Sequence, residues 1–170
     1  MKHSVRMYAA LLSLCLLAPV LLSAQKSKPG VLSSQEIKRV VPSAYFYGGQ
    51  SASVQVRNSS GFATTDGKLV LAGLVDNSGY STDVATKYQG FLITEVKLNI
   101  GGTELAPGQY GCGFSKDGKF YVLDVGANEL ASTSWQTDEK LARPVPLKIV
   151  AEGDMYRLYN GRKWVSLKAQ

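Results

Sequence analysis

Two turn dipeptides near the C-terminus constrain the fold more than any other feature of this sequence. Asn160-Gly161 is a strong signal for a two-residue hairpin loop, and Glu152-Gly153 is a plausible one. Together they predict an antiparallel meander with strands at residues 146–151, 155–159 and 162–168. The two turns place one set of apolar side chains on a single face: Leu147, Ile149, Tyr156, Leu158, Val165 and Leu167. This agreement predicts a sheet with one buried face.

A separate hairpin is predicted at Asp117-Gly118. Pairing outward from a two-residue turn places Phe114 opposite Tyr121, Cys112 opposite Leu123 and Tyr110 opposite Val125. All six side chains then share one face, so we expect Cys112 to be a buried apolar residue rather than a reactive thiol.

Earlier segments also have the alternation or apolar character of strands, namely residues 51–57, 68–75 and 91–100. Ser33 and Glu36 match a capping box, which predicts a short N-terminal helical turn ending before Pro42. Residues 126–145 form a long connection, either a lid or a segment that hides a short strand or helical turn. We therefore predict an all-β fold, an antiparallel β-sandwich of eight or nine strands, with a lipocalin-like up-and-down β-barrel as the alternative.

The N-terminus has the three parts of a secretory signal peptide: basic residues, an uncharged apolar run, and small residues at a cleavage site after Ala24. We therefore expect a signal peptide at 1–24, a flexible tether at 25–32 and a single β-rich domain at 33–170. The predicted location is periplasmic or extracellular, with no transmembrane span after processing. A membrane anchor is disfavoured because the apolar run is short and contains Pro19.

The missing residue types exclude several chemistries. The only histidine, His3, lies in the predicted signal peptide, so the usual Ser-His and Cys-His catalysis and His-based zinc sites are excluded from the mature chain. Without Lys2 and Arg6 the mature chain has 17 basic and 13 acidic residues, for a net charge near +4. The basic residues are scattered, so we expect no nucleic-acid partner. No motif predicts a metal or a cofactor.

Residues 100–111 read Ile-Gly-Gly-Thr-Glu-Leu-Ala-Pro-Gly-Gln-Tyr-Gly. This stretch resembles a "GG-x-x-L-x-x-G-x-Y" pattern of secreted bacterial β-sandwich domains of unknown function. The resemblance covers residues 96–125 and implies an exported bacterial β-domain. It carries no active site to this chain.

The outward face of the predicted meander is the candidate binding surface. It gathers Arg157, Tyr159, Arg162 and Trp164, with Arg157 expected opposite Trp164 and Tyr159 opposite Arg162. Aromatic rings stack on sugar or apolar surfaces, and arginine offers a fixed fork of donors to carboxylate or phosphate. Alternatively, these are ordinary cross-strand pairs that stabilise the sheet.

From these features we predict an exported, non-catalytic binding domain that interacts with a cell-envelope glycan, lipid or protein. One alternative is a lipocalin-like carrier of a small apolar molecule, which requires an apolar cavity. The other is a carboxylate-dependent glycan hydrolase, which requires two carboxyl groups about 5–10 Å apart in a cleft. Its acidic residues would come from Asp76, Asp83, Asp124, Glu129, Asp138 and Glu139.

Overall fold

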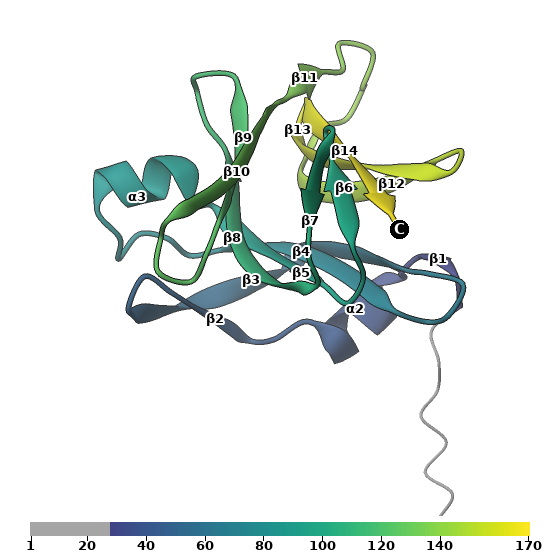
Figure 1. Cartoon of the computed structure of the whole chain (residues 1–170), viewed down its shortest axis with the longest axis horizontal. Helices are drawn as coiled ribbons and strands as arrows, with labels where there is room; N and C mark the ends of the chain where they lie inside the picture. The colour runs from purple at the N-terminus through teal and green to yellow at the C-terminus, as the bar shows by residue number, and fades with distance from the viewer. Residues whose placement is uncertain (1–27) are drawn as a thin grey trace, which may run out of the picture.

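The computed structural model describes residues 28–170, which form two antiparallel β-sheets packed against each other (Figure 1). The first sheet contains, in spatial order, β1 (Gly30–Val31), β3 (Gln50–Ala63), β4 (Leu69–Val75), β5 (Gly90–Thr94), β8 (Gly108–Phe114), β9 (Lys119–Leu123) and β10 (Glu129–Ser134), and β2 (Ala44–Tyr47) pairs with β3. The second contains β12 (Val145–Glu152), β13 (Met155–Gly161), β14 (Lys163–Ala169), β6 (Leu98–Ile100) and β7 (Thr103–Leu105), and β11 (Gln136–Thr137) pairs with β14. The all-β sandwich is confirmed, and because the sheets do not close into a barrel, the lipocalin-like barrel is wrong.

The described residues contain fourteen strands, so the predicted eight or nine was too few. The predicted strand at 91–100 is two strands, β5 and β6, which belong to different sheets because the chain crosses between sheets at 95–97. The long connection at 126–145 is no lid: it contains the short strands β10 and β11. Apolar periodicity does not show where a chain leaves one sheet for the other, so such breaks are hidden in the sequence.

The N-terminal part of the described chain begins inside the first sheet. The predicted signal peptide, residues 1–24, lies outside the described residues, as does the start of the predicted tether. Gly30–Val31 pair with β3 and Leu32 is buried, so the tether does not extend to residue 32. The predicted helical turn is α2 (Ser34–Val40), and the reciprocal Ser33–Glu36 hydrogen bonds of its capping box are present. In the described part of the chain, neither α2 nor α3 (Thr82–Lys87) has the length and apolar character needed to cross a membrane.

One hydrophobic core fills the space between the two sheets. The predicted apolar face of the β12–β14 meander is confirmed: its side chains pack on Phe62, Val70, Leu92, Cys112 and Phe120 of the first sheet. Tyr156 stacks on Phe62 with 3.7 Å between the ring centroids, which joins the two sheets directly.

A second core covers the opposite face of the first sheet. The β2–β3 ribbon and α2 supply Ile37, Tyr45 and Tyr47, and these pack on a set of buried side chains from the sheet: Leu71, Phe91, Tyr121 and Leu123. Figure 1 shows β2 and α2 on one side of this sheet and the second sheet on the other. The middle strands of the first sheet are therefore buried on both faces.

The β8–β9 hairpin has a different register from the predicted one. Phe114 pairs with Phe120, not Tyr121, and Cys112 pairs with Val122, not Leu123. The loop has three residues, 116–118, closed by a 2.9 Å hydrogen bond from Ser115 N to Lys119 O, and Gly118 occupies the left-handed region at φ +89°. Because both faces of β9 are buried, the apolar pattern did not reveal this one-residue error.

Cys112 lies in the core between the sheets and is 4% exposed, as predicted. Burial raises the pKa of its thiol to about 12. The thiolate, which is the reactive form of cysteine, is therefore scarce in the native protein near neutral pH.

Candidate functional site

Three of the four predicted site residues meet on the outer face of the β12–β14 meander, and we call Arg157, Tyr159 and Trp164 the arginine–aromatic face. The guanidinium carbon of Arg157 lies 4.0 Å from the centroid of the Trp164 ring, within cation–π distance. The rings of Tyr159 and Trp164 are 6.5 Å apart and inclined by 38°. Trp164 is half-buried, whereas Tyr159 is buried.

The cross-strand pairs differ from the prediction by two residues. Tyr159 pairs with Trp164, and Arg157 pairs with Ser166, because the loop of the hairpin is Gly161-Arg162 rather than Asn160-Gly161. Gly161 at the first loop position has φ +64°, a conformation that glycine adopts easily. A shift of two residues leaves every side chain on its predicted face, and Arg157 reaches Trp164 diagonally.

Arg162 does not join the other three residues. It lies in the hairpin loop, where Nη2 donates to the carbonyl of Leu141 at 3.1 Å. Its own carbonyl accepts a 2.9 Å hydrogen bond from the backbone N–H of Asp138. Arg162 therefore anchors the 138–141 segment, and the predicted pairing of Tyr159 with Arg162 is wrong.

Two acidic residues fix the arginine–aromatic face, and neither of them was predicted to contact it. Glu152 forms an ion pair with Nε of Arg157. Arg157 Nη1 donates to the hydroxyl of Tyr159 at 3.4 Å, and that hydroxyl donates to Oδ2 of Asp138 at 3.0 Å. The hydrogen bond to Tyr159 and the ion pair with Glu152 raise the pKa of Arg157 and keep the guanidinium charged.

The six acidic residues considered for glycan hydrolysis each have different surroundings in the structure. Asp138 accepts from Tyr159, and Glu129 forms an ion pair with Lys87 at 3.2 Å. Asp76 and Asp124 cap the backbone of their own turns, while Asp83 and Glu139 are exposed. Within residues 28–170 no hydrogen bond joins two of the six, and none of the six lines the larger cleft described below.

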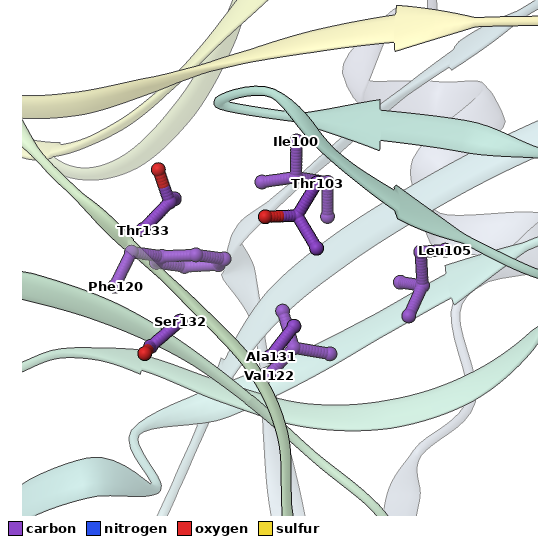
Figure 2. Close-up of a pocket in the computed structure, with 8 residues that line it drawn as sticks. All are labelled: Ile100, Thr103, Leu105, Phe120, Val122, Ala131, Ser132 and Thr133. Carbon is purple, nitrogen blue, oxygen red and sulfur yellow. The ribbon is translucent and has the colours of Figure 1, made fainter.

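The apolar pocket in Figure 2 lies where β7 of the second sheet approaches β10 of the first. Ile100, Leu105, Phe120, Val122 and Ala131 supply its apolar walls. Its volume is about 10 Å³, roughly enough for one water molecule. This pocket is too small for the cargo of an apolar carrier.

A larger cleft is lined by residues of both sheets, and we call it the amide cleft. It has a volume of about 410 Å³ and is lined by Gln55, Leu74, Val75, Asn77, Gln89, Phe114, Lys116, Asn160 and Lys163. Asn160 and Lys163 form the cross-strand pair next to Tyr159 and Trp164, so strand alternation turns them away from the arginine–aromatic face. The residues of this cleft come from five separate segments with no common spacing, so no sequence pattern predicts it.

The fold and these surfaces define an all-β, two-sheet antiparallel sandwich with an arginine–aromatic cluster on the outer face of its second sheet. No protein-family model, curated protein or solved structure matches the chain. These comparisons neither support nor contradict the resemblance of residues 96–125 to secreted bacterial β-sandwich domains.

Proposed function

We propose that this chain is a non-catalytic binding domain that is exported by its N-terminal signal peptide and interacts with the cell envelope. The export step is supported by the order of basic, apolar and small residues at 1–24. The binding surface is the arginine–aromatic face, and its ligand is an anionic or glycan-like envelope component.

The observation that carries this proposal is the fixed position of Arg157. Glu152 holds Nε, Tyr159 accepts from Nη1, and the Trp164 ring lies under the guanidinium plane. In the described part of the chain no hydrogen bond uses Nη2, and 27% of the Arg157 side chain is exposed. A guanidinium already ordered by three neighbours loses little rotamer freedom when a carboxylate or phosphate oxygen approaches its open edge.

The neighbours of Arg157 define what such a ligand must contain. Trp164 is half-buried and offers apolar ring surface beside the charged edge, and Val150, which pairs with Arg157, is 37% exposed. A ligand with an acidic group next to an apolar or sugar-ring surface matches both features. Because Glu152 neutralises part of the charge, a simple inorganic anion has less to gain here than such a mixed ligand.

The test is tryptophan fluorescence of the purified protein during titration with three probes: N-acetylglucosamine oligomers, polygalacturonate and phosphatidylglycerol vesicles. We expect a saturable change with at least one anionic probe that is retained in Trp135→Phe and lost in Trp164→Phe. Arg157→Ala should weaken binding in a calorimetric titration of the same probe, and Lys148→Ala on the same face serves as the charge-matched control.

An unchanged affinity in both Arg157→Ala and Trp164→Ala would show that this face is structural. In that case the contacts of Arg157 with Glu152 and Trp164 serve only to stabilise the sheet.

A further inference from the structure

The amide cleft has features of a ligand site that the arginine–aromatic face does not have. Its volume of about 410 Å³ falls within the range of small-molecule pockets. One wall comes from the first sheet and the segments that follow β4 and β8, and the other comes from Asn160 and Lys163 of the second sheet. A ligand in this cleft would therefore contact both sheets.

The polar lining consists of neutral carboxamides and ammonium groups. Four carboxamide residues, Gln55, Asn77, Gln89 and Asn160, share the cleft with Lys116 and Lys163, and none of its lining residues is acidic. In the described part of the chain neither lysine forms an ion pair, and Nζ of Lys163 lies 4.5 Å from the centroid of the Trp135 ring. The cleft therefore has a positive local charge that no carboxylate of its lining neutralises.

Hydrogen bonds hold the carboxamides in place before any ligand arrives. Gln89 donates from Nε2 to the carbonyl of Phe114 at 3.1 Å and accepts from the backbone N–H of Phe114 at 3.0 Å. Asn160 Nδ2 donates to Oε1 of Gln89 at 3.3 Å, which links the two sheets across the cleft. Asn77 Nδ2 donates to the carbonyl of Tyr88 at 2.7 Å. Prepositioned amides of this kind suit the recognition of hydroxyl groups because the cost of ordering them is already met by the fold.

The apolar wall of the cleft consists of Leu74, Val75 and Phe114. A sugar ring presents C–H surface as well as hydroxyl groups, so it can use the apolar wall and the carboxamides together. A purely apolar molecule would give the ammonium groups of Lys116 and Lys163 no anionic partner.

We propose that the amide cleft binds a small sugar acid. The carboxylate would lie between Lys116 and Lys163, the hydroxyl groups would contact the carboxamides, and the C–H face of the ring would pack on the apolar wall. The amide cleft is a different surface from the arginine–aromatic face, so a result against one proposal does not count against the other.

The test compares D-glucuronate, D-glucose and glucose 6-phosphate in titrations of isotope-labelled protein followed by two-dimensional NMR. We expect glucuronate to shift the side-chain amide resonances of Gln89 and Asn160, and glucose to bind about tenfold more weakly because it lacks the carboxylate. Lys116→Met and Lys163→Met should each weaken glucuronate binding by about the same factor, because each removes one charge-assisted contact. Lys148→Met, on the outer face of the second sheet, should leave it unchanged.

Three results would overturn the inference. They are the absence of shifts with all three probes, equal affinity for glucose and glucuronate, or tighter binding of glucose 6-phosphate, which would assign the cleft to phosphorylated ligands. Arg157→Ala and Trp164→Phe separate the two proposals. Glucuronate binding that is lost in these variants and retained in the lysine variants would reject the cleft while supporting the arginine–aromatic face.

Discussion

The ring of Tyr47, from β2, lies directly against Gly111 of β8: a Cβ atom on Gly111 would stand 2.5 Å from Cε2 of Tyr47. The same ring stacks on Tyr88, with 3.8 Å between the ring centroids. Gly111 therefore allows the β2–β3 ribbon to pack closely on the first sheet, and the ring stack holds the ribbon in that position.

The first prediction concerns this close approach. Gly111→Ala should lower the free energy of unfolding by about 1–3 kcal/mol, because the added methyl group overpacks a site with no free space. Urea unfolding measures the change. Gly79→Ala is the control, because its Cβ would meet only Gln50 Oε1 at 3.8 Å, and it should shift the unfolding free energy by less than about 0.5 kcal/mol. Equal losses in the two variants would contradict the packing argument.

The second prediction concerns the contact between Arg157 and Trp164. A double-mutant cycle with Arg157→Leu and Trp164→Leu should give a coupling energy of about 0.5–1 kcal/mol, as expected for a partly exposed cation–π pair. The cycle is measured by chemical denaturation. The pair Lys148–Trp164, for which the structure records no contact, provides the reference, and a coupling no larger than this reference would show that the stack contributes nothing to stability.

The third prediction concerns Cys112. Because burial raises the pKa of its thiol to about 12, iodoacetamide at pH 8 should leave Cys112 unmodified in the native protein and alkylate it fully in urea. Mass spectrometry of the peptide that contains Cys112 distinguishes this site from Cys15. Rapid alkylation of the folded protein would mean that the inter-sheet core opens on the time scale of the labelling.

The fourth prediction concerns pH. A 2.6 Å hydrogen bond from the hydroxyl of Tyr121 lowers the pKa of Asp117 below its ordinary value, so the ionised carboxylate stabilises the folded state above that ordinary value. This contribution should be complete at neutral pH and disappear as the pH falls below about 4 and through the lowered pKa.

The measurement is urea unfolding of wild type and Asp117→Asn at a series of pH values. The difference in stability should be largest near pH 7 and shrink in acid. A difference that is constant with pH would rule out the ionised hydrogen bond as its source.

The parts of the fold that sequence analysis predicted are those with one polar and one buried face. Along β12–β14, apolar residues such as Ile149 and Leu158 alternate with polar ones such as Lys148 and Arg157, so the face assignment survived a two-residue error in the turn. The β8–β9 hairpin lacks this contrast, because Phe120 packs between the sheets and Tyr121 packs in the second core. Apolar pattern alone cannot choose between two buried faces, and the three-residue loop at 116–118 decided the register.

The sequence also predicts only part of the candidate site. Arg157, Tyr159 and Trp164 share a face because they follow strand alternation, which the sequence displays. Glu152 and Asp138 could not be assigned to it, because the first lies at a strand end and the second on a segment positioned by Arg162. The amide cleft depends on how the two sheets meet, as at the contact of Asn160 with Gln89, and no local pattern encodes this.

The position of β14 between β13 and β6 has a consequence for biosynthesis. The β6–β7 hairpin is synthesised some 60 residues before β14, and it pairs with the rest of its sheet only through β14. A nascent chain that has reached β13 therefore still exposes the apolar side chains of β6 and one unpaired edge. Closure of the sandwich has to wait until β14 has left the ribosome, and the long separation between partners favours slow folding. A chain that cannot close early remains open to chaperones, and to any machinery that requires an unfolded substrate, for most of its synthesis.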